Sequence, residues 1–372
     1  MTPPYLVESA EFWTSKQRAG HSLHEISYRA CFKPQLPAFF INQFTSPGDL
    51  VFDPFMGRGT TPIEAALQGR LSAGSDGNPL CTMLTAARLQ PPSLENIKAR
   101  LNKIDWKRSV AISEDLLVFY HPETLQKICV LREEFGSNLL DPVDDWIRMV
   151  VLNRLSGHSS GYFSVRTMPP NQAVGIETQR QINIRFGQIP EPRDVPAIIL
   201  KKTGSLIRKC TVEERRYLIQ TQMQHQFWCG CATDTYPLAD NSVSLVVTSP
   251  PFLNVVNYAK ENWLRCWFVK IAPETLPTIT SSLKIWSDQM LKTLRQIYRV
   301  LKPGGHVAFE VGEVKKGNIR LEETVIPAGI QAGLTPKKIF INTQQFTKTS
   351  HCWGIKNNLF GTNTNRIVLF QK

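Results

Sequence analysis

Short apolar runs and a glycine-containing turn near the start of the chain predict alternating strands and helices. Residues 50–52 predict an apolar strand, the turn 53–59 contains two glycines, and residues 62–69 have helical periodicity. Residues 71–76 predict a second strand, which ends in Asp76. Strand, glycine turn, helix and strand form the first half of a doubly wound α/β fold, whose ligand lies over the carboxyl ends of the strands.

Side chains at the ends of these elements are candidates for capping and binding. A hydroxyl of Thr60 or Thr61 can cap the helix. Asp76 suits a ribose, because a carboxylate can accept hydrogen bonds from both hydroxyls. Asp53, before the turn, is placed to meet a cationic ligand group. A dinucleotide site would need a third glycine at position 62, where this chain has proline.

The last part of the chain repeats the alternation and predicts the rest of the sheet. We expect a strand over 225–234 that ends in Asp234, a strand over 242–248, an amphipathic helix over 263–269, a helix, turn and strand over 290–314, and a hairpin of 337–342 with 365–371.

About 130 residues separate the second and third predicted strands, where a simple doubly wound fold needs only a helix. Residues 122–136 and 142–157 predict amphipathic helices, and 158–194 show little periodicity. We therefore divide the chain into 1–94 and 225–372, the cofactor-binding and catalytic halves of one core, and 95–224, a large, mainly helical and loop-rich insert.

The positive charge of the chain indicates a polyanionic partner. The formal net charge is +12, and nucleic acid is the usual partner of such a field. Residues 148–209 contain ten Lys or Arg and three Asp or Glu, so more than half of the excess lies in the insert. The alternative interpretation is a solvated charged surface.

Within the insert, two groups of cations are expected to contact DNA differently. Arg166 and Arg180, in the amide-rich stretch that also holds Arg185, are candidates to read a guanine edge. Lys201 and Lys202, around a predicted turn over 201–209, are candidates to hold phosphates. Arg208 and Lys209, from the same predicted turn, are also candidates to hold phosphates. The amides Asn171, Gln172 and Gln181 are candidates to contact base edges or phosphates. Tyr162 and Phe163 could stack on bases or anchor the loop.

Cysteine spacing and hydropathy exclude other classes of protein. The eight cysteines form no CxxC pair, and we interpret them as buried free thiols. His225 with Cys231 is too sparse for a zinc site, so no metal is expected. No run of 18 apolar residues and no signal-peptide pattern occurs, so we expect a cytoplasmic protein without membrane contact.

The stretch "TSPPF" (248–252) follows an apolar strand and carries candidate chemistry. Two prolines stiffen the backbone and remove two donors, so the acceptors around them are fixed. Taken alone, the stretch could equally be a strand-ending turn with an aromatic plug.

Two motifs together resemble a known family. "DPFMGRGTT" (53–61) resembles the cofactor motif of S-adenosylmethionine-dependent amino-methyltransferases acting on nucleic acid, and "TSPPF" resembles their catalytic motif. Ser before two prolines resembles the N4-cytosine DNA methyltransferases, whereas the N6-adenine and RNA guanine-N2 enzymes mostly carry Asp or Asn there. The resemblance implies a Rossmann-like, doubly wound class I methyltransferase sheet and S-adenosylmethionine as cofactor.

The resemblance also implies roles for individual residues. Segment 31–44 resembles the family segment that closes over the methionine end of the cofactor. Asp53 and Gly57 should face the methionine part, Asp76 should hold the ribose, and Asp234 should lie near the adenine. The remaining implied cofactor residues are Phe32, Lys33, Pro34, Pro54, Phe55, Gly59, Thr60 and Thr61. Arg58 departs from the family pattern, and it either reaches a phosphate or points to solvent.

The catalytic roles follow from the same resemblance. The Ser249 hydroxyl and the Pro250 carbonyl can accept the hydrogens of an exocyclic amine, Pro251 stiffens the bend, and Phe252 offers a face to an extruded base. We therefore expect a methyltransferase that modifies cytosine N4 in a short sequence of double-stranded DNA with a flipped target base. A cognate restriction endonuclease acting separately is the expected partner. The alternatives are an N6-adenine or RNA base methyltransferase, and a non-catalytic DNA-binding subunit.

Overall fold

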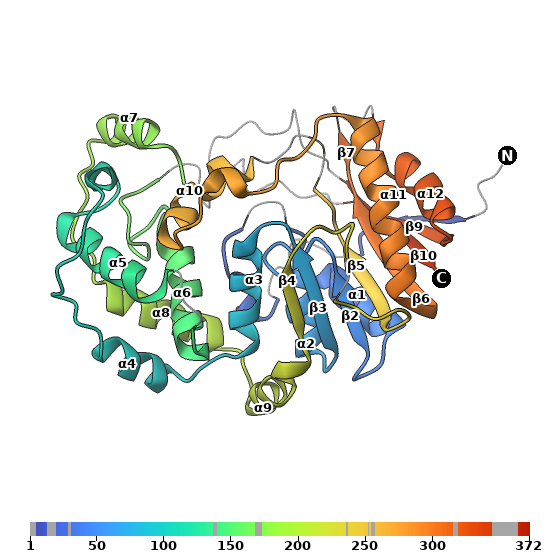
Figure 1. The fold of residues 1–372 in the computed structure, drawn as a ribbon, viewed down its shortest axis with the longest axis horizontal. Helices are drawn as coiled ribbons and strands as arrows, with labels where there is room; N and C mark the ends of the chain where they lie inside the picture. The colour runs from blue at the N-terminus through green and yellow to red at the C-terminus, as the bar shows by residue number, and fades with distance from the viewer. Residues whose placement is uncertain are drawn as a thin grey trace.

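The computed structural model describes residues 5–12, 20–28, 31–136, 140–167, 173–235, 237–251, 253, 257–314, 319–343 and 364–372. An eight-stranded sheet forms its centre (Figure 1). The strand order is β1-β9-β10-β6-β5-β2-β3-β4. The bounds are β1 Leu6–Ala10, β2 Leu50–Asp53, β3 Leu71–Asp76, β4 Gln226–Cys229, β5 Val243–Thr248, β6 Leu301–Val311, β9 Thr335–Thr343 and β10 Thr364–Gln371. A separate two-stranded sheet pairs β7 Glu313–Val314 with β8 Ile319–Arg320.

All neighbours in the large sheet are parallel except β10, which is antiparallel to both β6 and β9. Successive residues of β2 face opposite layers: Val51 packs in one apolar cluster with Phe40, and Phe52 packs in another with Leu294. Phe40 belongs to α1 (Gln35–Phe44), and Leu294 belongs to α11 (Leu283–Val300). Helices therefore cover both faces of the sheet, and the predicted doubly wound α/β fold of the class I methyltransferase type is confirmed.

The other core helices are α2 (Thr60–Leu67), α3 (Pro79–Ala86), α10 (Tyr258–Phe268) and α12 (Glu322–Gln331). The insert contains α4 (Leu94–Asn102), α5 (Pro122–Phe135), α6 (Pro142–Arg154), α7 (Ile176–Phe186), α8 (Val195–Ile207) and α9 (Val212–Thr221). Each of α5 and α6 has proline in its first turn and a side-chain cap, His121 and Asp141 respectively. These two helices agree with the predicted bounds.

Three local predictions were wrong. Residues 158–194 contain α7, which ends at Gly187 in the left-handed conformation, with φ of 56°. The expected turn over 201–209 is mostly the end of α8, where Gly204 is tolerated inside the helix. The strand predicted to end at Asp234 ends at Cys229, so Asp234 lies in the following turn. At α7 and α8 the chain is helical where local composition favours a loop and a turn, because local propensity is a weak signal.

The expected hydroxyl cap of α2 was also wrong. The N-cap is Gly59 with φ of 75°, and it makes no side-chain cap hydrogen bond. Thr61 instead donates its hydroxyl to the Val247 carbonyl at 3.0 Å, which ties α2 to β5. Thr60 Oγ1 accepts from Arg58 Nε at 3.2 Å. The Thr61 hydroxyl is therefore used for a tertiary contact, and the Thr60 hydroxyl for a local contact within the turn.

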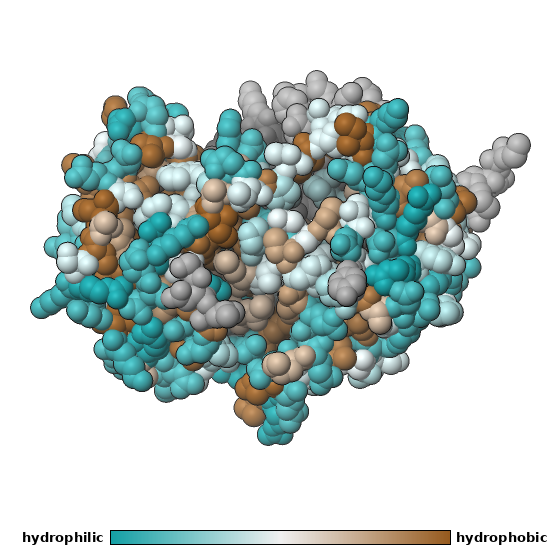
Figure 2. Space-filling model, viewed as in Figure 1, coloured by the Kyte–Doolittle hydropathy of each residue, from teal (hydrophilic) through white to brown (hydrophobic). Residues whose placement is uncertain are grey.

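One apolar cluster joins the insert to the core. It includes Leu84 of α3, Trp146 of α6, Ile199 of α8 and Phe268 of α10, all fully buried. Helix α10 comes from the second half of the core, yet it packs among insert residues (Figure 1). The space-filling view shows apolar surface where the insert meets the core (Figure 2). Within the described residues, no helix is long and apolar enough to cross a membrane.

Candidate active site

A cavity of about 550 Å³ opens at the carboxyl ends of the central strands. The glycine turn contributes Phe55 and Gly57, β3 contributes Asp76, and the double-proline stretch contributes Ser249. The cavity wall also includes Tyr28, Cys31, Phe32, Pro54, Gly77, Cys231, Pro250, Pro251, Tyr258, Trp286 and Glu310. The two motifs, separated by almost two hundred residues in the chain, therefore share one cavity.

The glycine turn is fixed by the acid at the end of β3. Asp76 accepts hydrogen bonds from the backbone amides of Gly57 at 3.0 Å and Asn78 at 2.9 Å. Gly57 has φ of 51°, a conformation that glycine adopts without strain. Burial raises the pKa of the Asp76 carboxyl. A carboxylate has about four acceptor positions, so Asp76 keeps capacity for donors of a ligand in the cavity.

Gly59 allows close packing between the start of α2 and α3. A Cβ at this position would lie 2.3 Å from the Thr85 hydroxyl, which belongs to α3, and the backbone has positive φ. The second glycine of the motif therefore allows α2 and α3 to approach each other. Among the described residues that line the cavity, Gly59 is absent.

Asp53 is a buried acid below the turn, with 1% of its surface exposed. Its Oδ1 accepts from the Thr248 hydroxyl at 2.6 Å and from the Phe55 amide at 3.0 Å. Its Oδ2 has no hydrogen-bond partner among the described residues. Burial raises the pKa of Asp53 to about 7. Asp53 is absent from the described residues that line the cavity, but it lies directly before Pro54, which does line it. A cationic group of a ligand close to this carboxylate would offset the cost of burying its charge.

The double-proline bend follows β5 directly. Ser249 is half-buried and Pro250 is buried, and both line the cavity. Trp286 of α11, 1% exposed, donates its indole Nε1–H to the Pro251 carbonyl at 2.9 Å. This bond occupies the second proline carbonyl and holds the bend, so the Ser249 hydroxyl and the Pro250 carbonyl are the acceptors of the motif left for a ligand. The fourth predicted catalytic residue, Phe252, lies outside the described residues.

Sequence reasoning missed Trp286. It stands in line with Met290 and Ile297 on the apolar face of α11, a spacing typical of a core residue. Tyr28 and Tyr258 were missed for a related reason, because no local pattern marks them and only the fold brings them to the cavity.

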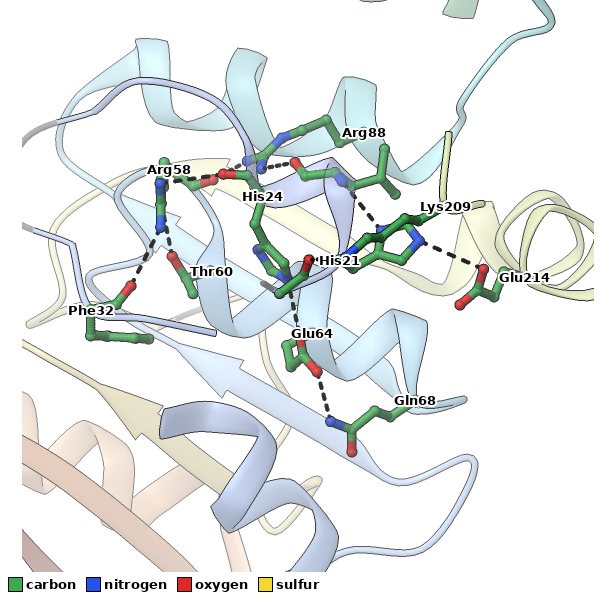
Figure 3. Close-up of polar contacts among 12 residues, drawn as sticks. His21, His24, Phe32, Arg58, Thr60, Glu64, Gln68, Arg88, Lys209 and Glu214 are labelled. Atoms are coloured by element: carbon green, nitrogen blue, oxygen red, sulfur yellow. Dashed lines mark hydrogen bonds and ion pairs between the residues drawn. The ribbon is translucent and has the colours of Figure 1, made fainter. Parts of the chain in front are cut away.

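Arg58 braces the turn (Figure 3). Its guanidinium donates to the carbonyls of His24 at 3.3 Å, Ile26 at 3.1 Å and Phe32 at 3.5 Å. Both predicted roles, phosphate contact and a solvent-facing side chain, were therefore wrong. The bonds hold the segment 20–28 and Phe32 beside the glycine turn, and Phe32 lines the cavity.

A buried polar cluster supports this brace (Figure 3). Arg88, fully buried, donates to the carbonyls of Leu84 at 2.8 Å and Leu23 at 2.9 Å, and also to that of Arg58. His24 Nε2 lies 2.8 Å from Glu64 Oε2 of α2. Burial lowers the pKa of His24 to about 4.

Segment 20–28 also contacts the insert. Lys202 donates to the Glu25 carbonyl at 2.5 Å, Arg208 forms an ion pair with the Glu25 carboxylate, and Lys209 donates to the Gly20 carbonyl at 3.1 Å. Burial lowers the pKa of Lys202 to about 8. These three cations contact the protein itself, whereas the Lys201 side chain is exposed.

Other cofactor candidates lie around the cavity. Pro34 is the N-cap of α1. Within the described residues Lys33, Pro34, Thr60, Thr61 and Asp234 are not part of the cavity wall. Thr60 and Thr61 are buried, and Asp234 is exposed.

The predicted DNA-reading arginines lie at the outer end of the insert. Arg166 and Arg185 are exposed, with their guanidinium carbons 5.1 Å and 5.6 Å from the centre of the Phe186 ring. Arg180 pairs with Glu177 at 2.5 Å. Gln181 donates to Glu177, and Asn171 and Gln172 lie outside the described residues.

Burial decides whether Tyr162 and Phe163 stack on bases or anchor the loop. Tyr162 is 8% exposed beneath the Arg154 guanidinium, and Phe163 is fully buried. Both therefore anchor the loop.

The cysteines are partly as expected. Cys81, Cys129 and Cys266 are buried free thiols, but Cys229 and Cys231 are exposed, so that part of the interpretation was wrong. In the part of the chain that the structure describes, no three His, Cys, Asp or Glu side chains gather as a metal site.

Comparisons with known proteins find similarity to DNA methyltransferases. Residues 5–82 match the model of an N6/N4 methyltransferase family, described as DNA methylase. Over 86 residues the chain is 34% identical to the type II methyltransferase M.MjaII of Methanocaldococcus jannaschii, which covers 23% of this chain and 16% of that protein. Over 355 residues it is 21% identical to the type II methyltransferase M.BsoBI of Geobacillus stearothermophilus, covering 86% of this chain and 68% of that one.

Among solved structures, the similarity to TrmN from Thermus thermophilus has a TM-score of 0.36 at 10% identity, covering 94% of this chain and 51% of that chain. The family and sequence matches support a DNA methyltransferase of the group that modifies N4 or N6 amines, with S-adenosylmethionine as its cofactor.

Proposed function

We propose that the protein methylates the N4 amine of cytosine at a specific site in double-stranded DNA, as the modification enzyme of a restriction–modification system. One observation carries the proposal: the stiff Ser249–Pro250 bend and the cofactor turn around Gly57 line the same cavity. S-adenosylmethionine, when bound, supplies an electrophilic methyl group on a sulfonium. Phe32, Asp53, Gly57 and Asp76 are the residues that would hold it.

The chain must make a poor nucleophile reactive. The lone pair of the cytosine amine is delocalised into the ring, so its hydrogens must be held while positive charge develops on nitrogen. The Ser249 hydroxyl and the Pro250 carbonyl can accept these hydrogens, and these contacts strengthen as the charge grows. Trp286 holds the neighbouring carbonyl, which keeps the bend in one orientation before substrate arrives.

Ser249 favours cytosine over adenine in this proposal. The amino-methyltransferases that modify adenine mostly carry an acid or amide at this position, and this chain has a hydroxyl. The target must leave the duplex to reach the cavity, so we propose a flipped base. The insert, over 95–224, would hold the duplex through exposed cations such as Arg166, Arg185 and Lys201. A cognate endonuclease acting separately would complete the system.

Expression in a host without DNA methylation tests the proposal. Single-molecule sequencing of the host genome should find N4-methylcytosine at one recurring short sequence, and mass spectrometry of hydrolysed DNA should identify the base. The Ser249→Ala variant, expressed at the same level, is the control and should modify a much smaller share of these sites. N6-methyladenine at a recurring site would refute the cytosine assignment, and unmodified DNA with an active cofactor site would refute the DNA substrate.

A further inference from the structure

The outer end of the insert exposes three large apolar side chains within six residues of the chain. Ile184, Phe186 and Ile189 are 70%, 48% and 82% exposed. They lie on the last turn of α7 and directly after Gly187, which ends the helix. We call these three side chains the α7 ridge. Figure 2 shows apolar surface at the upper left, where Figure 1 places α7.

Helix α7 and the residues after it are fixed to the insert by amide side chains. Gln179 and Gln188 donate to the Arg166 carbonyl at 3.1 and 2.9 Å, and Asn183 donates to the Val118 carbonyl at 2.8 Å. These hydrogen bonds fix the end of α7, so the three apolar side chains of the ridge are exposed on an ordered segment. Large apolar side chains exposed on such a segment often mark a contact surface.

Uncompensated positive charge flanks the ridge. The guanidiniums of Arg166 and Arg185 stack near Phe186, and neither has an acidic partner within ion-pair distance among the described residues. Nearby cations are paired: Arg180 with Glu177, and Arg193 with Glu191 at 3.7 Å. A second copy of the ridge would bring like charges together, which is unfavourable. A partner that joins negative charge to apolar surface fits better.

We propose that the α7 ridge packs against sugars and base edges in a groove of duplex DNA, while Arg166 and Arg185 contact the adjacent phosphates. The proposal rests on DNA being the substrate. In this proposal the three uncharged side chains of the ridge contribute directly to DNA affinity. Phosphate contacts release counterions and make affinity depend on salt, whereas apolar contacts do not. Substitution of the apolar residues and substitution of the two arginines should therefore change the salt dependence of DNA affinity differently.

Fluorescence anisotropy with a duplex of about 30 base pairs, at four or more salt concentrations, separates them. The triple variant Ile184→Ala, Phe186→Ala, Ile189→Ala should bind about tenfold more weakly at every salt concentration, with an unchanged log–log slope. Arg166→Gln with Arg185→Gln should reduce the slope by roughly 1 for each phosphate that the variant no longer binds. Ile330→Ala on α12, a residue 53% exposed, is the matched control and should bind like the parent.

The outcomes distinguish this inference from the proposed function. A parent protein that neither binds nor methylates duplex DNA refutes the proposed function and the ridge contact together. A parent that methylates DNA, with a folded triple variant that binds equally well, refutes only the ridge contact. A parent that is dimeric in light scattering, with a monomeric triple variant of parental DNA affinity, would assign the ridge to a second copy.

Discussion

Asp53 combines deep burial with one carboxylate oxygen that has no partner in the described part of the chain. Its pKa of about 7, against an ordinary 3.8, means that the free protein holds this proton near neutral pH. A cationic ligand group beside the carboxylate would favour the ionised form. Cofactor binding should therefore be linked to loss of a proton.

We expect S-adenosylmethionine affinity to fall by up to about tenfold per pH unit below pH 7 and to be flat above it. Isothermal titration calorimetry between pH 5.5 and 8.5 measures this. Asp53→Asn should bind more weakly and with little pH dependence. If the affinities of the parent and of Asp53→Asn depend on pH in the same way, Asp53 is not part of the cofactor site.

The free protein should show the opposite trend in stability. Because the folded pKa is raised, the native state binds more protons than the unfolded chain between about pH 4 and 7. The contribution of Asp53 to stability therefore falls as pH rises through this range and is constant above it. The difference in unfolding free energy between the parent and Asp53→Asn isolates this contribution from those of other groups.

Ser249 offers a sharper test of the chemistry. Ser249→Ala should lower the single-turnover methylation rate by roughly 10²-fold and leave DNA affinity nearly unchanged, because the hydroxyl acts mainly in the transition state. Ser244→Ala is the control: Ser244 lies on β5, the strand that precedes the bend, and its hydroxyl donates to Asp49 at 2.6 Å away from the cavity. A normal rate for Ser249→Ala would make this hydroxyl structural only.

At the level of elements, α11 connects the sheet core with the active site. Its apolar face packs on the sheet, and Trp286 near its start reaches the double-proline bend. The helix thus determines the orientation of a motif to which it is not adjacent in sequence.

Trp286→Phe should keep most of the packing and lose the hydrogen bond to Pro251. We expect the single-turnover rate to fall about tenfold, with cofactor and DNA affinities within a factor of about two, and a loss of about 1–3 kcal/mol in stability from the unpaired carbonyl. Trp263→Phe is matched, since that indole donates to the Val174 carbonyl at 3.1 Å outside the cavity. Equal rates for both variants would reduce Trp286 to a core residue.

The elements that the sequence predicts well are those with strong local signals. Strands β2, β3 and β5, helices α5 and α6 and the glycine turn all follow from periodicity, capping residues and prolines. The sequence does not predict β1, whose Leu6 and Val7 face solvent and which becomes a strand only by pairing with β9. It fails at α7 too, because the amides that fix this helix bond to distant carbonyls.

The residues of the candidate site likewise fall into those that a sequence motif marks and those that only the fold identifies. Asp76, Gly57 and the double proline are visible as motifs, and the structure brings them to one cavity. The role of Arg58, the indole of Trp286 and the contacts of Lys202 depend on segments far apart in the chain. Only the folded arrangement can assign them.

At the scale of the whole molecule, the insert and the core share one apolar cluster. Leu84, Trp146 and Phe268 belong to three predicted regions but pack in the same cluster. The boundaries at 94 and 224 stay predictions, yet this shared packing argues against independent folding of the insert.

Thermal unfolding should accordingly show one cooperative transition, with the calorimetric enthalpy equal to the van't Hoff enthalpy. Differential scanning calorimetry measures both. Deletion of residues 95–224 should give an insoluble or unfolded chain, because it exposes the buried side chains of α3 and α10. Two separable transitions, or a soluble folded deletion variant, would contradict a shared core.

The strand order has a consequence for synthesis on the ribosome. β1 pairs with β9 through Leu6 and Lys338, and β9 joins the rest of the sheet only through β10, which follows it in the chain. At about 5–20 residues per second, β1 emerges on the order of tens of seconds before its partner exists. Until β10 is in place, neither strand has a permanent neighbour in the sheet. During that interval the nascent chain offers an unpaired strand edge to chaperones, and the edge of the sheet is the last part of the fold to become permanent.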